Sequence, residues 1–272
     1  MLSVAVALAG VSLPGHAQVP QRIVSINLCA DELVLRIAEP KQIASVTWLS
    51  HDPANTNLAG LASRYPANRG LTEEVIALKP DLVIAGRHTT RNTVDQLNRA
   101  GVAVLELDMP ASLAETEAQI RMLGARLGQM ARARAIIAAM RARLADIPLP
   151  TGKPSAILYQ PNGFTAGTGS LIDTLLTRAG FNNLAAEKGL QNYGAVPLEM
   201  IVALQPDALI MNAEHEAPTL AYDVLRHPVL KVLPRMKIVN IPPRLWTCAG
   251  PEMVEAVALL AAAGRRITGD ER

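Results

Sequence analysis

The chain has 272 residues, of which 50% are hydrophobic and only 3% aromatic, and its formal net charge is +2. This apolar content excludes intrinsic disorder, and two cysteines in so long a chain exclude a disulfide-stapled miniprotein. The balanced charge, without a run of Lys or Arg, gives no indication of a nucleic-acid partner, and the scarcity of aromatic residues predicts a core of Ala, Leu, Val and Ile.

Residues 1–17 have the features of a secretory signal peptide. Residues 1–13 carry no charged side chain and include an apolar run, and the small residues that follow place the cleavage after Ala17. The run is too short to span a bilayer, and the cleavage site has no Cys for a lipid anchor. Because no Lys or Arg precedes the run, a buried N-terminal helix remains the alternative. We expect an exported protein whose mature part is soluble.

The mature chain begins with a strand, a loop and a helix. Residues 22–26 form a β-branched run, and an apolar-periodic segment that opens at Asp31 ends at Ile37. Residues 43–48 predict the next strand. Residues 49–70 are rich in Asn, Pro, Ser and Gly, so we expect a long loop without a core element, and long loops of this kind are usually functional.

One sequence unit occurs twice. Residues 73–84 read as a short helix that ends at Pro80 and is followed directly by a buried strand. Residues 199–210 align with this unit without a gap, 126 residues later. Two copies, each preceded by a strand and helix pattern, predict two similar α/β lobes, because the repeats of a solenoid are much shorter.

A strong helix-forming segment separates the two copies. Residues 112–147 have Ala, Leu, Met, Arg, Glu or Gln at almost every position. As one helix the segment would reach about 50 Å, long enough to connect both lobes. Two ordinary helices that break near Gly124 and Gly128 are the alternative.

These elements predict an α/β protein of two Rossmann-like lobes that are joined by one long backbone helix, with the ligand cleft between the lobes. We expect the following division of the chain: signal peptide 1–17, N-terminal lobe 18–111, connecting helix 112–148 and C-terminal lobe 149–272.

The duplicated unit, together with the signal and the long helical segment, resembles one protein family. The family comprises the periplasmic binding proteins for iron-siderophores and cobalamin that serve ABC importers, in the class with a helical backbone. The resemblance covers residues 21–268. Residues 83–101, Phe164 with the three residues that follow it, and Trp246 are most similar to the cobalamin-binding members. Those members carry an aromatic residue where this chain has Gly86, which argues against an identical ligand pose.

The resemblance implies a docking role for one acidic residue in each lobe. In that family such a residue, at the start of the helix before the Pro-Asp strand, binds arginines of the membrane permease. By position these residues are Glu73 and Glu199, and Glu74 is the nearest rival of Glu73. Two matched carboxylates suit a two-fold symmetric partner. The competing explanation is that Glu in the first turn of a helix is favoured by the helix dipole alone.

The ligand site is expected on the loops beyond the carboxyl ends of the strands. Five aromatic residues on these loops offer flat apolar contact to a chelate: Trp48, Tyr65, Phe164, Tyr193 and Trp246. Arg87 and Arg244, with His88, are candidates to meet an anionic group of the ligand. For any single aromatic residue, ordinary packing is the alternative.

Cys29 and Cys248 both fall in predicted cleft loops. A disulfide between them would tie the mouths of the lobes together, and secreted proteins usually pair their cysteines. Alternatively, one or both thiols face the ligand or its metal, since a Cys at a helix N-terminus has a lowered pKa. Two separate buried cysteines are the third possibility.

Together these features predict a non-enzymatic periplasmic solute-binding component of an ABC importer. Its ligand would be a bulky metal chelate, either a cobalamin-like corrinoid or an iron(III)-siderophore, and its partners the permease dimer with its ATPase. We expect a monomer when free, no resident metal site and no cofactor other than the ligand's own metal. The alternatives are a two-lobed tetrapyrrole chelatase-like enzyme and a receptor for haem or a free metal ion.

Overall fold

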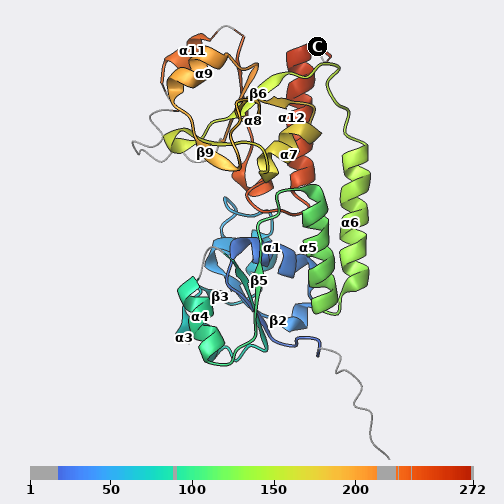
Figure 1. The fold of residues 1–272 in the computed structure, drawn as a ribbon. Helices are drawn as coiled ribbons and strands as arrows, with labels where there is room; N and C mark the ends of the chain where they lie inside the picture. Colours follow the sequence, from blue (N-terminus) through green and yellow to red (C-terminus); the bar gives the residue numbers. More distant parts are fainter. Residues whose placement is uncertain (1–17, 88–90, 213–224, 226, 234, 271–272) are drawn as a thin grey trace, which may run out of the picture.

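The protein consists of two α/β lobes with three long helices along one side (Figure 1). The structure is a computed structural model that describes residues 18–87, 91–212, 225, 227–233 and 235–270. The predicted signal peptide, 1–17, lies outside the described residues. The three helices are α5 (Leu113–Arg126), α6 (Met130–Ala145) and α12 (Met253–Thr268). Among the described helices, none combines the length and the apolar character needed to cross a membrane.

The N-terminal lobe is built on a five-stranded parallel sheet with the strand order β3-β2-β1-β4-β5. Its strands are β1 (Ile23–Ser25), β2 (Ile43–Thr47), β3 (Ala67–Asn68), β4 (Leu82–Gly86) and β5 (Val104–Leu107). Its helices are α1 (Leu28–Ile37), α2 (Ala59–Ala62), α3 (Thr72–Ala77) and α4 (Arg91–Arg99), with 3-10 turns η1 (Pro40–Gln42) and η2 (Trp48–His51). The strands predicted at 22–26 and 43–48 are confirmed as β1 and β2.

The segment 49–70 is more ordered than its composition predicts. It contains α2 and also β3, which forms the edge of the sheet beside β2. Asn68 of β3 is buried, and its side-chain amide donates to the backbone oxygens of Ser25 and Val46 at 2.9 and 3.0 Å. The expectation that this segment holds no core element is therefore wrong, because a buried amide replaces the apolar side chains that usually reveal a strand.

The C-terminal lobe has a four-stranded parallel sheet, in the order β11-β10-β6-β8, and a separate antiparallel pair. The strands of the sheet are β6 (Ser155–Leu158), β8 (Asn182–Asn183), β10 (Ala208–Met211) and β11 (Lys237–Asn240), and the pair is β7 (Phe164–Ala166) with β9 (Tyr193–Ala195). Its helices are α7 (Leu171–Arg178), α8 (Leu184–Glu187), α9 (Leu198–Leu204) and α11 (Val229–Val232), with turns η3 (Pro161–Gly163) and η5 (Pro243–Leu245).

The two copies of the repeated unit adopt the same local structure. The residues before each Pro, Lys79 and Gln205, both have a left-handed backbone, with φ of 48° and 45°. The carboxylate of Asp81 accepts from the backbone N–H of Arg22 at 2.9 Å, so it ties the start of β4 to the start of β1. Asp207 accepts in the same way from the backbone N–H of Ser155 at 2.8 Å, at the start of β6. The Pro-Asp pair therefore fixes the pairing of two strands in each lobe.

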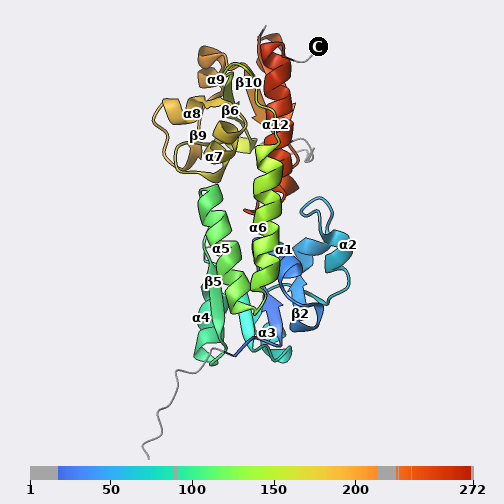
Figure 2. The same cartoon turned by 90° about the vertical axis from the view of Figure 1, so that its right-hand side faces the viewer.

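The connecting segment is not one helix. It forms α5 and α6, which pack against each other and are joined at residues 127–129, so the expectation of a single long helix is wrong and the alternative of two helices is confirmed. The break follows from Gly128, whose φ of +69° lies in the left-handed region. Helix α6, about 24 Å long, extends from beside the N-terminal lobe to the C-terminal lobe, as Figure 2 shows.

One aliphatic core runs through both lobes. A single cluster of buried residues contains Ile23 and Ile84 of the first sheet, Ile120 of α5, and Leu175 and Val257 of the second lobe. Trp246 and Phe181 are its only fully buried aromatic members among the described residues. The prediction of an aliphatic core is confirmed.

Gly124 of α5 marks the closest approach of α5 to α6, because a Cβ there would lie 2.4 Å from the Cβ of Ala133. Helix propensity alone predicts that Gly124→Ala stabilises the protein by about 1 kcal/mol. We expect a net loss of roughly 1–3 kcal/mol, since the added methyl group forces the two helices apart. Thermal unfolding followed by circular dichroism measures the difference.

The matched control for this variant is Gly60→Ala. Gly60 lies in helix α2, and a Cβ there meets nothing within 4 Å. We expect this control to leave the melting temperature unchanged or raised. A Gly124→Ala protein that melts at or above the temperature of wild type would contradict the close packing of α5 on α6.

Candidate ligand-binding cleft

The strand order of each sheet creates a crevice at one edge. In the N-terminal lobe the chain moves outward from β1 to β3 and then returns to β4 on the other side of β1, and β6 and β10 have the same relation in the C-terminal lobe. Loops diverge at such a switch point, which leaves space beyond the carboxyl ends of the strands. The loops after β1, β4, β6 and β10 therefore surround a space between the lobes.

A cavity of about 480 Å³ occupies this position. From the N-terminal lobe its wall includes Asn27, Cys29, Gly86, Arg87, Asp108 and Met109. From the C-terminal lobe its wall includes Gln160, Phe164, Leu171, Tyr193, Asn212 and Trp246. Cavities of this size enclose a drug-sized molecule, or one part of a larger molecule where the mouth is open.

The antiparallel pair β7–β9 presents two stacked aromatic rings to the cavity. The ring centroids of Phe164 and Tyr193 are 5.6 Å apart, and their planes differ by 15°. Both side chains stay partly exposed, at 39% and 38%, although they are large and apolar. Partial burial raises the pKa of the Tyr193 hydroxyl, so this group is neutral at physiological pH. The two rings form a flat apolar surface on which a planar ligand can stack.

The polar part of the wall combines one ion pair with several side-chain amides. Arg87 Nε lies 2.7 Å from Asp108 Oδ1, and both side chains are more than half exposed. The amide-bearing residues of the wall are Asn27, Gln119, Gln160 and Asn212. Trp246 is almost completely buried, and its indole N–H donates to Asn212 Oδ1 at 3.3 Å. In the described parts of the chain, no three His, Cys, Asp or Glu side chains are grouped to hold a metal ion.

The cavity brings together five of the nine residues expected to bind ligand: Cys29, Arg87, Phe164, Tyr193 and Trp246. The other four, Trp48, Tyr65, Arg244 and Cys248, lie outside the described cavity wall. Trp48 is 52% exposed on η2, and Tyr65 packs against the main core. Arg244 Nε donates to Asn57 Oδ1 at 2.9 Å, so its guanidinium joins the lobes to each other instead of pointing into the cavity wall. His88 lies outside the described residues.

The loop after β5 is not among the loops that the sequence predicts around the ligand. Asp108 and Met109 follow this strand and line the cavity, and Met109 is 65% exposed. β5 lies beside β4 in the sheet, so its carboxyl end reaches the same edge. The sequence pattern of this strand was visible, since a mostly apolar run with Val102 and Val104 follows Gly101 and ends at the polar residue Asp108.

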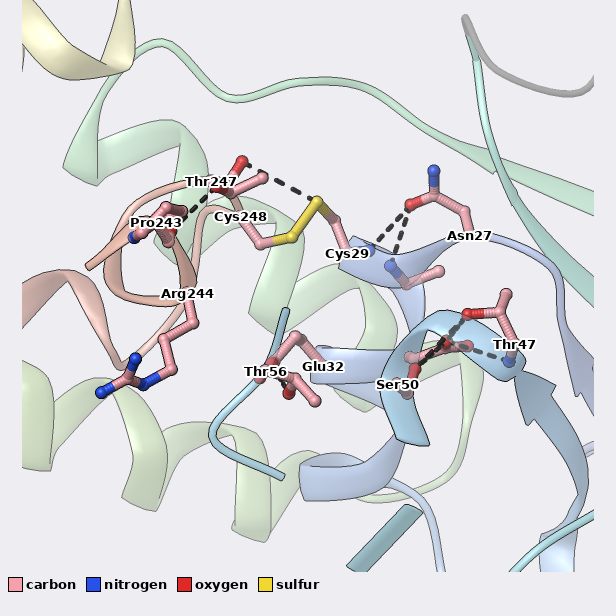
Figure 3. Close-up of a disulfide and its surroundings, with 12 residues drawn as sticks. Asn27, Cys29, Glu32, Thr47, Ser50, Thr56, Pro243, Arg244, Thr247 and Cys248 are labelled. Carbon is pink, nitrogen blue, oxygen red and sulfur yellow. Dashed lines mark hydrogen bonds between the residues drawn. A yellow bond between two sulfur atoms is a disulfide. The ribbon is translucent and has the colours of Figure 1, made fainter. Parts of the chain in front are cut away.

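An inter-lobe strap joins α1 to the segment before α12. Cys29 and Cys248 form a disulfide with a Cα–Cα distance of 5.0 Å, which confirms one of the three alternatives for these cysteines (Figure 3). The same strap contains the ion pair of Arg36 with Glu252, and the contact of Asn57 with Arg244. We use the name inter-lobe strap for these three contacts. Each of these contacts links the two lobes directly.

The acidic side chains of α1 are buried at this junction. Glu32 accepts from the hydroxyl of Thr56 and pairs with Arg36 at 3.0 Å, and burial raises the pKa of its carboxyl. Asp31 is completely buried, and its Oδ2 accepts from the backbone N–H of Thr47 at 3.0 Å and from the hydroxyl of Ser50. Its Oδ1 has no hydrogen-bond partner among the described residues. Burial therefore raises the pKa of Asp31 to about 6, against the opposing effect of these hydrogen bonds.

The raised pKa of Asp31 predicts a specific dependence of stability on pH. An acid whose pKa is raised by folding binds its proton more tightly in the native state, so the native state loses stability as pH rises from about 4 to about 6. Asp31→Asn cannot ionise and should lack this loss, which is on the order of 3 kcal/mol.

Urea unfolding between pH 3.5 and 8 tests this prediction. We expect the unfolding free energy of wild type minus that of Asp31→Asn to fall through the window between the two pKa values and to level off above it. A difference that stays constant across this range would show that Asp31 titrates at its ordinary value.

Comparison with known proteins identifies the family. The sequence pattern of the Periplasmic binding protein family matches residues 23–237. This chain belongs to that family. Solved structures agree with the fold: the periplasmic heme-binding protein RhuT from Roseiflexus sp. RS-1, in its apo form, superimposes with a TM-score of 0.75. It is 23% identical, and the match covers 91% of this chain and 99% of the Roseiflexus chain.

Two curated relatives are similar in sequence. A cobalamin-binding protein of Halobacterium salinarum is 26% identical over 198 residues, which cover 70% of this chain and 53% of the relative. The match thus spans about half of the length of that protein. An uncharacterised ABC transporter substrate-binding lipoprotein of Bacillus subtilis, YvrC, is 24% identical over 254 residues, or 89% of this chain and 79% of the relative.

Proposed function

We propose that this protein is the periplasmic solute-binding component of an ABC importer and that it carries a bulky metal chelate. The ligand is a corrinoid such as cobalamin or an iron(III)-siderophore. The protein is monomeric when free and needs no resident cofactor, because the metal arrives with the ligand. The family, and the relatives named for cobalamin binding and ABC transport, support this proposal.

The observation that carries the proposal is the cavity between the lobes. It lies beyond the carboxyl ends of strands from both sheets, and an aromatic stack forms part of its wall. A flat ligand held there would touch both lobes at once, so the bound and free forms would present different surfaces to a partner. This is the property that an importer needs in order to recognise a loaded receptor.

The charges of the described wall favour a ligand with little net charge. The guanidinium of Arg87 is already paired with Asp108, so an anionic ligand group approaching it would also meet a carboxylate. The wall amides offer both donors and acceptors, which suit the carboxamide groups of a corrinoid or the neutral hydroxamates of some siderophores. We therefore rank these ligands above catecholate siderophores and haem.

The chelatase-like enzyme is not retained, because the family is one of solute-binding proteins. Haem stays as a second candidate ligand, since the Roseiflexus protein with the same fold is named for heme binding. Calorimetric titration with cyanocobalamin, a ferric hydroxamate, a ferric catecholate and haem tests the proposal. Failure of all four to bind would overturn it.

The stacked rings should contribute to ligand affinity and little to folding. Phe164 and Tyr193 are partly exposed and belong to a short two-stranded pair, so Tyr193→Ala removes contact area from the cavity without opening the main core. We expect the affinity for the bound chelate to fall by roughly tenfold or more, with a small change in melting temperature. Calorimetry and thermal unfolding measure the two effects.

Trp48→Ala is the matched control, since Trp48 is also an exposed aromatic residue but lies outside the cavity wall. It should leave the affinity unchanged. Equal losses of affinity for Trp48→Ala and Tyr193→Ala would mean that the ligand binds elsewhere.

We propose that Glu73 and Glu199 dock on the permease. Each is exposed in the first turn of a helix, α3 in one lobe and α9 in the other, directly before the repeated Pro-Asp strand. Both helices lie on the left of Figure 1, on the side away from α6. Glu74 already makes a local hydrogen bond, in which its carboxylate accepts from the backbone N–H of Arg69 at 2.7 Å. This contact supports Glu73 over its neighbour as the docking residue.

Neutralising both docking residues should uncouple delivery from binding. For Glu73→Gln with Glu199→Gln we expect unchanged chelate affinity. Chelate uptake into vesicles that contain the partner permease and ATPase should be at least tenfold slower, because charge-assisted contacts to Arg are lost. Glu106→Gln, an exposed residue of β5, is the control. Uptake at the wild-type rate with the double variant would refute the docking role.

A further inference from the structure

The disulfide of the inter-lobe strap is part of the cavity wall. Cys29 itself lines the cavity, and so do Thr247 and Ala249 on both sides of Cys248. Cys29 follows β1 of the N-terminal sheet, whereas Cys248 precedes α12 of the C-terminal lobe, 219 residues away in sequence. One covalent bond thus limits how far the two walls of the cavity can separate.

The two sides of the cavity differ in how firmly they are held. On the side of the strap, the disulfide is accompanied by the ion pair of Arg36 and Glu252, whose side chains are each 15% exposed. The rim formed by Arg87, Asp108 and Met109 is more than half exposed. Near that rim the lobes are linked by the hydroxyl of Thr174 in α7, which donates to the backbone oxygen of Ala111 at 2.8 Å. Loss of the disulfide therefore removes the covalent restraint between the two walls and leaves noncovalent contacts.

Both cysteines are partly exposed, so a thiol reductant can reach the bond. Cys29 lies in the first turn of α1, where Asn27 caps the helix by accepting from the backbone N–H of Cys29 at 3.0 Å. A thiolate at this position is stabilised by the helix dipole, which makes Cys29 the better leaving group. The geometry favours attack of an external thiolate on Sγ of Cys248.

We propose that the Cys29–Cys248 disulfide is a reducible site whose redox state is coupled to occupancy of the cavity. A bound chelate contacts both walls of the cavity and holds them together, which slows reduction, and reduction in turn weakens chelate binding. The inference rests on the proposed function, since it requires that a chelate occupies this cavity. Because coupling between two equilibria is reciprocal, the factor by which the chelate stabilises the disulfide equals the factor by which the disulfide strengthens chelate binding.

The reductant is a dithiol, either a small molecule or a thiol-disulfide exchange protein. Its first thiolate attacks Sγ of Cys248, a mixed disulfide forms, and Cys29 leaves as a thiolate that takes up a proton. The second thiol of the reductant then attacks the mixed disulfide and releases Cys248 as a thiol. Two electrons pass to the protein disulfide, and the dithiol is oxidised to its own disulfide.

The rate of reduction with and without ligand tests the coupling. Folded oxidised protein is exposed to dithiothreitol, and free cysteines are trapped with a maleimide and counted by mass spectrometry. The probe is cyanocobalamin or, if it does not bind, the tightest chelate of the titration panel, and its absorbance shows whether it stays intact. We expect a saturating chelate to slow reduction by at least about fivefold. Equal rates with and without a bound chelate would overturn the inference and leave the proposed function standing.

The affinity of the reduced form provides the second test. We expect reduced wild type and Cys29→Ser/Cys248→Ser to bind the chelate equally, and both at least about fivefold more weakly than oxidised wild type. If the double variant does not fold, the comparison of oxidised with reduced wild type decides alone. Equal affinities of the oxidised and reduced forms would contradict the coupling, whereas absence of binding by every chelate would refute the proposed function itself.

Asn57→Ala is the matched control for loss of an inter-lobe contact. It removes both hydrogen bonds between the Asn57 side chain and Arg244 but leaves the disulfide intact. Chelate should protect the disulfide of this variant as strongly as that of wild type. Loss of protection in Asn57→Ala would show that the strap as a whole, and not the covalent bond, controls the cavity.

Discussion

Helix α1 connects three parts of the molecule that depend on its position. It starts directly after β1, at the switch point of the first sheet, so its N-terminus reaches the cavity edge, where Cys29 forms part of the wall. Two residues later, Asp31 accepts from the backbone N–H of Thr47 at the end of β2 and from the hydroxyl of Ser50 in η2. At its far end Arg36 pairs with Glu252 of the other lobe. The position of α1 therefore determines the geometry of the sheet edge, the cavity and the lobe interface at the same time, because all three contacts are made by this one helix.

The same local device then builds the site twice. A left-handed residue followed by Pro and Asp ends a short helix, and the Asp carboxylate holds the starts of two neighbouring strands in register. Because the strands start together, their carboxyl ends arrive at one edge, where β4 delivers Gly86 and Arg87 and β10 delivers Asn212. A feature that acts at the amino ends of the strands thus determines the site at their carboxyl ends.

The sequence predicts those parts of the structure that depend on local chemistry. The Pro-Asp copies and the runs at β1 and β2 carry their information within a few residues, and so do the aromatic residues of the β7–β9 pair. The break at Gly128 is only one of two alternatives from the sequence, because helix propensity favours continuation, whereas the packing of α5 on α6 requires a left-handed glycine. β3 was missed because its burial depends on an amide that bonds to two other strands.

Non-local contacts explain why the other predictions about the site differ from the structure. An arginine on a cleft loop gives no sign of whether it faces the ligand, and Arg244 instead meets Asn57, 187 residues away in sequence. Cys29 and Cys248 could form a disulfide, face the ligand or be buried separately, and the choice depends on how the two lobes are placed relative to each other. No short segment of sequence determines that placement. Asp108 and Met109 were accessible in principle, since a strand next to β4 must end at the same edge.

The core that passes through both lobes has a consequence for the architecture as a whole. Residues of the first sheet, of α5 and α6, and of α7 and α12 belong to one buried cluster, while each lobe also has a smaller cluster of its own on the other face of its sheet. Because the largest cluster is shared, we expect the two lobes, which look like separate domains in Figure 1, to unfold together. A chain cut between them would expose the face that each lobe shares with the helical hairpin, and the cleft would be lost with the fold.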